Sequence, residues 1–388
     1  NESVSQSLRD VMREVDPERE NKLFGGITVL FAGDWRQILP VVPKGRQGQI
    51  VEASLLKSHI WDEIHTLTLS TNMRAANAGG NALEFVEFLD AIGTGTYEPS
   101  KPCTQLSERI VKLPKDMLFQ PQLPPPHPDQ TRTHQRIQAV VDKVFFSGQN
   151  MMEHDGQTPP PAEQTLEYAV CNRAIICPTN ALVREVNFVA INSFPGDKKE
   201  YLSSDKLLEE DNGEDFGTEL LNTLDGGSSG FPDHALYLKK GAIIMLLRNL
   251  NPAEGHCNGT RYVIRNMNRH TIDAEVASGA FKGKKLLIPR LKFLPSESYP
   301  FQFSRTQFPV RLAFAITANK SQGQTYEKIG ICLQHSPFFT HGQLYVALSR
   351  VGNKDNIFVS LSDDKKGEDE GTTSNVVYKQ VLRDANVI

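Results

Sequence analysis

Short runs of apolar residues recur along the chain, and each is closed by a polar or glycine-rich turn. One run covers residues 27–32 and is followed by Gly33–Gln37, a second covers 64–69, and a third covers 174–177. Helical patterns separate these runs, and continuous apolar strands that alternate with helices are typical of a parallel, doubly wound sheet. The pattern therefore predicts an α/β fold with ligand-binding groups just past the carboxyl ends of buried strands.

The clearest helical pattern opens the chain, where residues 1–15 carry apolar side chains at positions 4, 8, 11, 12 and 15. Further helices are predicted near 51–59, 83–92, 134–146 and 181–191. Thr179 or Asn180 can cap the last of them. Because the chain opens on this helical pattern with Asn1 rather than methionine, and two strands are too few to close a first domain, we expect a truncated amino terminus with sequence upstream of Asn1.

Residues 236–294 follow a different pattern. Short strands are predicted at 242–247, 261–264, 271–276 and 285–288, separated by turn residues at the spacing of a small barrel. Asn258-Gly259-Thr260 matches a glycosylation acceptor, but we interpret it as a tight turn between two of these strands. The pattern predicts a small all-β module inserted into an α/β domain that resumes at Arg311. Proline-rich tracts at 121–128 and 159–161 are predicted to be surface excursions.

Composition narrows the possible functions only slightly. The 388 residues are 39% hydrophobic and 23% charged, as in ordinary soluble globular proteins. The net charge of −4 provides no global basic field, so any contact with nucleic acid has to be local. Five scattered cysteines without a C-x-x-C pair argue for reduced thiols and against a disulfide frame or a zinc site. No apolar run approaches the length of a membrane span.

Asp34 and Gln37 lie directly after the first apolar run. An acidic residue there can hold a metal ion, although Trp35 stands where a second carboxylate would help. Gln37 is better suited to hydrogen-bond a γ-phosphate or its attacking water. The alternative is a turn at a strand end that the Asp34 side chain caps without any ligand.

The segment Thr317–Thr325 is rich in small and amide side chains. Gly323 allows close backbone approach, and the neutral side chains offer donors to phosphate oxygens without holding any one of them too strongly. Lys320 lacks the G-x-x-x-x-G frame of a P-loop lysine. The alternative is an Asn- and Gly-rich turn that binds nothing.

Arg74 and Arg350 each follow an apolar element and are candidate arginine fingers, because a guanidinium can neutralise charge that develops on a γ-phosphate. The alternative for each is a solvated cap at the end of an element. No G-x-x-x-x-G-K-[ST] loop occurs in the sequence, and Gly279–Lys284, which comes nearest, has the wrong spacing and ending. No apolar strand ends in Asp-Glu either.

These segments together resemble a known family. Gly33–Pro40 is similar to helicase motif III, 72–74 (Asn-Met-Arg) to motif IV, Thr317–Thr325 to motif V and His341–Arg350 to motif VI. The combination resembles the petite-integration-frequency (PIF) type DNA helicases of superfamily 1B, and above all the helicase part of Helitron transposon proteins. The resemblance extends over nearly the whole chain from Leu23.

The resemblance implies two RecA-like domains with an inserted SH3-like β-barrel. The first RecA-like domain would end within 1–73, and the second would comprise 74–239 and 306–388 around a barrel at 240–305. Residues implied at the nucleotide are Asp34, Gln37, Arg74, Gln322, Gly323 and Arg350, with Gln37, Arg74 and Arg350 catalytic. Residues implied at DNA are Pro40, Thr317, Asn319, Lys320, Ser321, Gln324, Thr325 and His341. No metal ligand is expected within the chain.

By this resemblance the partners are single-stranded and forked DNA, the cofactors are ATP and Mg²⁺, and the location is nuclear or also mitochondrial. Motif I and motif II, which supply the main ATP and Mg²⁺ ligands, are expected upstream of Asn1. Two functions stay open at this point. The chain is either the carboxyl-terminal part of an ATP-dependent 5′–3′ DNA helicase, inactive by itself, or an inactive transposon-derived fragment that at most binds single strands. Polarity, oligomeric state and a role in repair, telomere maintenance or transposition are not determined by the sequence.

Overall fold

The computed structural model describes residues 1–69, 82–98, 100–102, 108–125, 131–147, 165–207, 230–295, 302–362 and 370–388. The chain forms two compact units. Unit 1 comprises Asn1–Leu113, Phe338–Asn353 and Lys366–Ile388, and unit 2 comprises Pro114–Pro337 and Lys354–Lys365. Within the described residues, no helix is both long and apolar enough to cross a membrane.

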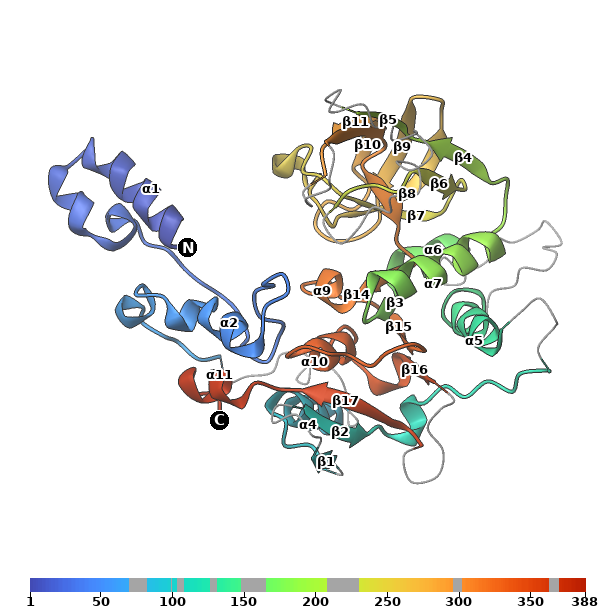
Figure 1. Cartoon of the computed structure of the whole chain (residues 1–388), viewed down its shortest axis with the longest axis horizontal. Coiled ribbons are helices and arrows are strands. Elements are labelled where there is room, and N and C mark those ends of the chain that lie inside the picture. The colour runs from blue at the N-terminus through green and yellow to red at the C-terminus, as the bar shows by residue number, and fades with distance from the viewer. Residues whose placement is uncertain are drawn as a thin grey trace, which may run out of the picture. The chain divides into compact units, whose positions relative to one another are not determined.

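Unit 1 consists mainly of short helices. Their bounds are α1 Glu2–Arg13, α2 Gln47–Glu52, α4 Ala82–Thr94, α10 Gln343–Leu348 and α11 Lys379–Asp384 (Figure 1). Strands β1 (Ser100–Pro102), β2 (Glu108–Lys112) and β17 (Thr372–Val376) form an antiparallel sheet in the order β1-β2-β17. The predicted helices at 1–15 and 83–92 are confirmed, whereas the helix predicted over 51–59 is wrong, because α2 ends at Glu52 and single 3₁₀ turns follow.

Two strands predicted in unit 1 are absent. Residues 27–32 and 64–69 form no strand, and Leu30 and Leu69 are 88% and 97% exposed. An isolated extended segment has no ladder to satisfy its backbone groups, and no described segment pairs with either run. The apolar pattern was therefore a correct sign of strand propensity but not of strand formation in this chain.

Unit 2 contains the parallel sheet that the sequence predicts, in the order β14-β3-β15-β16. Its strands are β3 Arg173–Cys177, β14 Ala315–Thr317, β15 Lys328–Leu333 and β16 Ile357–Leu361, and its helices are α5 Arg132–Val141, α6 Leu166–Asn172, α7 Asn180–Ser193 and α9 Ala318–Ser321. Gly330 lets α5 approach β15, since a Cβ atom there would lie 3.0 Å from Val140 Cγ1. The predicted cap of α7 is Thr179, whose hydroxyl accepts a hydrogen bond from the Leu182 amide.

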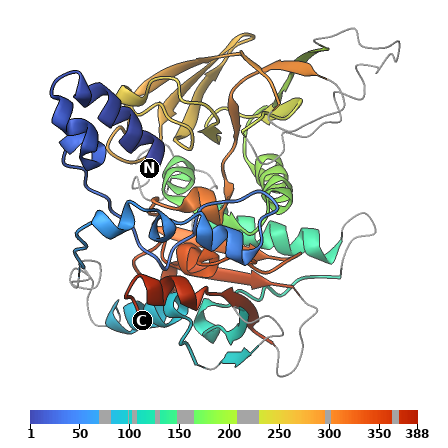
Figure 2. The ribbon, with the colours of Figure 1, turned by 60° about the vertical axis from the view of Figure 1, so that its left-hand side comes forward.

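The inserted module is all-β, as predicted, and its strands pair antiparallel. Five strands pair in the order β10-β9-β8-β7-β13, and Figure 2 shows most of them in yellow to orange. Their bounds are β7 Ile243–Leu246, β8 Arg261–Met267, β9 Thr271–Val276, β10 Lys285–Pro289 and β13 Val310–Leu312. Three further strands, β5 (Ser204–Leu207), β11 (Leu291–Phe293) and β12 (Phe303–Gln307), form a second sheet, and β4 (Lys199–Leu202) pairs with β6 (Ala235–Leu238). Strand pairing therefore extends beyond residues 240–305 on both sides, and closure into an SH3-like barrel stays a prediction.

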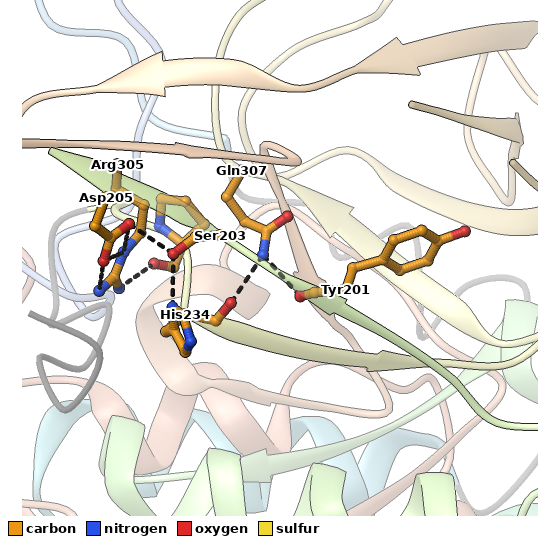
Figure 3. Close-up of polar contacts among 7 residues, drawn as sticks. Tyr201, Ser203, Asp205, His234, Arg305 and Gln307 are labelled. Atoms are coloured by element: carbon orange, nitrogen blue, oxygen red, sulfur yellow. Dashed lines mark hydrogen bonds and ion pairs between the residues drawn. The ribbon is translucent and has the colours of Figure 1, made fainter. Parts of the chain in front are cut away.

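A buried polar network fixes β4, β5, β6 and β12 to one another (Figure 3). The Arg305 guanidinium is fully buried and pairs with the Asp205 carboxylate at 2.8 Å. Ser203 contacts both Asp205 and the His234 ring, at 2.6 and 2.7 Å. The Gln307 amide donates to the carbonyl oxygens of Tyr201 and His234, as Figure 3 shows. A buried ion pair tolerates burial only when its remaining donors and acceptors are satisfied, and this network satisfies them.

Candidate nucleotide and nucleic-acid interface

In unit 1, the Asp34–Gln37 segment forms a tight turn. The Gln37 amide donates to the Asp34 carbonyl at 3.0 Å, and the Arg36 amide donates to Asp34 Oδ1, also at 3.0 Å. A carboxylate that accepts a hydrogen bond from a backbone amide two residues later makes an Asx turn. The second oxygen, Oδ2, accepts a hydrogen bond from the Tyr345 hydroxyl at 2.9 Å. Asp34 thus caps the turn, the ligand-free alternative that the sequence left open, and both of its oxygens have protein donors.

The start of α10 and the two residues before it, His341 and Gly342, pack against this turn. His341 is fully buried, and its Nδ1 accepts a hydrogen bond from the Tyr378 amide at 2.9 Å. Its Nε2 lies 2.8 Å from the Trp35 carbonyl oxygen, to which it must therefore donate. Burial lowers the pKa of His341. His341 therefore holds the turn as a neutral imidazole, and the expectation that it contacts DNA is corrected, because it has no exposed surface and no free ring nitrogen.

Gly342 makes this close packing possible. Its φ is +73°, and a Cβ atom built there would lie 2.5 Å from the Arg36 carbonyl oxygen. Only glycine combines a left-handed conformation with so close a backbone approach. The Gly-Gln pair that opens α10 is therefore explained by packing against the Arg36–Gln37 backbone.

The remaining predicted residues of unit 1 differ in their accessibility. Gln37 is half-buried and Pro40 is exposed. Arg350 is 4% exposed, and its guanidinium turns back, donating from Nε to the Val346 carbonyl at 2.7 Å and from Nη2 to Ser349 Oγ at 2.7 Å. Arg350 therefore does not protrude as the finger prediction expects. Arg74, with the whole motif IV resemblance, lies outside the described residues.

In unit 2, the Thr317–Thr325 segment lines one side of a groove of about 680 Å³. The other walls are the loop at 258–261 and the β9–β10 connection at 276–281. Six of the predicted ligand-binding residues line this groove: Asn319, Lys320, Gln322, Gly323, Gln324 and Thr325. Residues predicted to bind the nucleotide and residues predicted to bind DNA thus line the same groove.

Two predicted residues of this segment serve the local fold instead. Thr317 caps α9, because its hydroxyl accepts a hydrogen bond from the Lys320 amide at 3.3 Å. Ser321 is fully buried, and its hydroxyl donates to the Ala318 carbonyl at 2.8 Å. Neither residue lines the groove. The expected DNA contact of the Ser321 side chain is therefore corrected, and Thr317 shapes the turn that presents its neighbours.

The groove is lined by neutral groups and by two cations, Lys320 and the buried Arg261, whose guanidinium donates to backbone carbonyls. Lys320 is exposed, and its Nζ donates to Asn258 Oδ1 at 3.3 Å. Partial desolvation, and to a lesser extent the nearby Arg311, lower the pKa of Lys320. Gln324 Nε2 donates to the Lys320 carbonyl at 3.1 Å, which holds the turn closed. Gly323 has a φ of +77° and open space beside it, so a ligand backbone can approach it closely.

Sequence reasoning missed the two other walls. Asn258, Gly259 and Thr260 form the turn that was predicted, but nothing in the pattern placed it against Lys320. The segment Gly279–Lys284, which fails as a P-loop, supplies Gly279, Ala280 and Phe281 to the opposite wall. No local pattern could predict that Tyr345 bonds Asp34 either, because the two residues lie 311 positions apart in the sequence.

The described residues form no cradle for a nucleoside triphosphate. They contain no group of three His, Cys, Asp or Glu side chains that could hold a metal ion. Asp34, the one predicted carboxylate, already has two donors on its two oxygens. Because the sequence also lacks the P-loop, the residues present do not fit Mg-ATP, and we derive no hydrolytic step from them.

A parallel sheet that carries an antiparallel insertion is a RecA-like fold, and solved structures share it. A Candida albicans Pif1 helicase structure matches with a TM-score of 0.53 and 18% identity, covering 99% of this chain and 75% of that one. A Bacteroides Pif1 bound to single-stranded DNA matches with a TM-score of 0.54 and 19% identity, covering 99% and 73%. At these identities the likeness shows the fold.

Sequence comparisons find similarity to helicases over two parts of the chain. The model described as PIF1-like helicase matches residues 1–102, and the model described as DNA helicase Pif1, 2B domain, matches residues 219–267. The ATP-dependent DNA helicase PIF1 of Danio rerio is 32% identical over 36% of this chain, and that of Xenopus laevis is 34% identical over 34%. Two parts of the chain are thus similar to PIF1-type helicases. The chain spans about a fifth of the length of these relatives, 21% and 20%.

Proposed function

We propose that this chain binds single-stranded DNA in the groove of unit 2 and serves as the strand-contacting part of an ATP-dependent 5′–3′ DNA helicase. The observation that carries the proposal is the groove itself. Six residues of the predicted motif V line it, with a single lysine among neutral donors and an unobstructed glycine.

This chemistry suits a strand that has to move. Amide and hydroxyl groups bind phosphate oxygens without a full charge, so that each contact is weak enough to be exchanged for the next. Lys320 adds one electrostatic contact, and Phe281 offers an aromatic wall on which a base can stack. Phosphate contacts and stacking carry no sequence information by themselves, and we therefore expect binding that is largely independent of sequence.

The names of related proteins support the helicase part of the proposal. The curated relatives are called ATP-dependent DNA helicases, and the solved neighbours include Pif1 bound to single-stranded DNA and Pif1 helicases unwinding forked double-stranded DNA. A Bacteroides Pif1 structure also contains ADP-AlF3 and single-stranded DNA. The 5′–3′ direction, the nuclear or mitochondrial location and the likeness to Helitron proteins are proposals from the family resemblance.

We propose that the nucleotide is bound partly by residues of this chain and partly by residues that this sequence lacks. Gln37, Arg74 and Arg350 would face the γ-phosphate, while a P-loop and an Asp-Glu pair that this sequence lacks would hold ATP and Mg²⁺. Arg350 could do so only after its guanidinium leaves the Val346 carbonyl. Accordingly, we propose that the chain by itself does not hydrolyse ATP.

The second candidate is a protein that only binds single strands. The buried Arg350 guanidinium favours it, as does the lack of a triphosphate cradle among the residues that the structure describes. Steady-state ATPase assays separate the two candidates. In a protein that carries a P-loop and an Asp-Glu pair ahead of this sequence, DNA-stimulated ATPase is expected, and Arg350→Ala should abolish it. Full turnover in that variant would contradict the finger assignment, and no turnover in the parent would favour the second candidate.

DNA binding by the chain itself is tested with a dye-labelled oligo-dT in fluorescence anisotropy. Lys320→Ala should weaken binding about tenfold, the equivalent of about 1.4 kcal/mol. It should also flatten the dependence of log K on log salt by about 0.7, one phosphate contact on a single strand. The control is Lys240→Ala, an exposed lysine that does not line the groove. Equal affinity and salt dependence in parent and Lys320→Ala would contradict the proposed groove.

A further inference from the structure

Unit 2 contains a second cavity, of about 340 Å³, between helix α7 and the strands β6 and β13. Two arginines, Arg184 and Arg311, and one acid, Asp233, contribute its charged groups, and Phe188 and Tyr237 contribute its aromatic rings. Asn180, Asn187, His234 and several aliphatic side chains complete the lining. A pocket that is apolar and aromatic on its walls and carries a few polar groups is the usual form of a small-ligand site.

One stripe of α7 supplies much of this lining. Asn180, Arg184 and Phe188 all line the cavity, and their spacing of four residues places them on the same face of the helix. Phe188 is 52% exposed, although it is large and apolar. Asn187, in contrast, is used internally, because its amide bonds the backbone of Leu312 and Ala315. The stripe is therefore directed at the cavity rather than at the core.

The positive charges in this region exceed the negative ones. Arg311 is half-buried, and within the described residues its guanidinium forms no hydrogen bond or ion pair. Burial lowers the pKa of Arg311, and the Asp233 carboxylate offsets this only in part. Arg184 and Lys320 both lie close enough to repel it. An anion in the cavity would relieve that repulsion.

The opposite wall is held rigid. His234 lines the cavity and belongs to the buried network of Figure 3, where its ring contacts Ser203 and its carbonyl accepts from Gln307. Tyr237 follows it on β6, and Lys198 covers one face of its ring, with Nζ 5.1 Å from the centroid. A wall fixed in this way loses little conformational entropy when a ligand binds.

We propose that this cavity holds one nucleotide of the bound single strand, with its phosphate at Arg311 and Arg184 and its base against Phe188. The inference rests on the proposed function. A planar guanidinium suits a phosphate, and an exposed aromatic ring suits a base, whereas no other described feature of the cavity calls for a different ligand class. A nucleotide in this position extends the contact with the strand beyond the six groove residues.

The strand, rather than a free nucleotide, is favoured by continuity. Lys320 lines the groove and Arg311 lines the cavity, and the two cations are near enough for their charges to interact. Phosphates of one strand could therefore bind at both places. A free mononucleotide shares the same chemistry and is the source that the experiment has to distinguish.

The experiment uses the full chain and a dye-labelled oligo-dT of about 16 nucleotides, long enough for more than one such site. Arg311→Gln should weaken binding about tenfold and flatten the salt dependence by about 0.7, because one phosphate contact is lost. Phe188→Ala should weaken binding about tenfold with the salt dependence unchanged, since stacking carries no charge. Because Phe188 is exposed, this second variant does not depend on the fold tolerating a change at Arg311.

Matched controls are Arg269→Gln and Phe339→Ala, both exposed and outside the two cavities. A cross-linking oligonucleotide that carries 4-thiothymidine should attach to a peptide with Phe188 or Tyr237, and an excess of dTMP should not abolish this. Parent-like affinity and salt dependence in both variants would overturn the inference while leaving the groove intact. Loss of the cross-link with dTMP, without loss of oligonucleotide affinity, would assign the cavity to a free nucleotide and also overturn it. Failure of the parent to bind oligo-dT would overturn the proposed function itself.

Discussion

Similar apolar runs have opposite structures in the two units: one is exposed and forms no strand, and the other is a buried strand. Residues 27–32 in unit 1 and 173–177 in unit 2 read alike, yet Leu30 is 88% exposed while Ile176 is fully buried. Strand β3 lies between β14 and β15, which satisfy its backbone groups on both sides. The run in unit 1 has no such neighbour among the described residues and is held only where it ends. An apolar run therefore forms a strand only where neighbouring segments can pair with its backbone N–H and C=O groups.

The run in unit 1 is held at its end by α10. His341 bonds the Trp35 carbonyl, Tyr345 bonds the Asp34 carboxylate, and Gly342 lies against the Arg36 carbonyl. These contacts replace the strand ladder with a few specific interactions. Unit 1 should therefore be sensitive at the turn and tolerant along the run, whereas unit 2 should be sensitive along the strand itself.

The largest effect is expected from Ile176→Ala in β3. Removing buried methylenes costs about 2–5 kcal/mol in a packed core, because the cavity does not fully collapse. Leu30→Ala at the matching run in unit 1 should stay within about 0.5 kcal/mol, as exposed substitutions do. Guanidinium unfolding followed by circular dichroism measures both. Equal losses would contradict the difference between the two runs.

A smaller effect is expected from Gly342→Ala. A left-handed conformation at a residue with a Cβ costs about 1–3 kcal/mol, and the new Cβ would also collide with the Arg36 carbonyl oxygen, 2.5 Å away. Both tryptophans, Trp35 and Trp61, lie in unit 1 and pack edge to face, so their fluorescence reports its unfolding. Gly352→Ala is the control, since nothing lies near its Cβ position and its φ is not left-handed. A parent-like midpoint for Gly342→Ala would show that α10 does not support the turn.

The smallest effect is the pH dependence of unit 1. Burial places the pKa of His341 below its ordinary 6.5, so the unfolded state binds this proton more readily than the folded state. The stability that the neutral imidazole contributes is complete above about pH 6.5 and is lost as pH falls toward the folded pKa, at no more than about 1.4 kcal/mol per pH unit.

Tryptophan-detected unfolding between pH 7.5 and pH 5 should therefore show this loss in the parent chain. His341→Gln should show less of it, because an amide can donate and accept without titrating. The exposed His65→Gln serves as the control, since it should retain the dependence of the parent. An identical pH profile in the parent and His341→Gln would contradict a buried, neutral His341.

Much of the local structure could be predicted from the sequence. The helices at 1–15, 83–92 and 181–191, the β3 strand and the inserted antiparallel module all follow from periodicity, since burial of one face repeats along a helix or strand. The ligand contacts expected for Thr317–Thr325 stay predictions, although six residues of this segment line one groove. The sequence could not predict which polar side chains would hydrogen-bond the protein's own backbone, as Ser321, Thr317 and His341 do.

By itself, the sequence determined the order of elements, the insertion of an antiparallel module and the motif residues that relate the chain to PIF1-type helicases, because these depend on patterns within short windows. Only the tertiary structure decided that residues 27–32 would stay outside any sheet, that Arg350 would turn back onto its own helix, and that Lys320 would meet Asn258 across a groove. These outcomes join residues far apart in the chain. They depend on which distant segment supplies a hydrogen-bond partner or excludes water, and no local pattern carries that information.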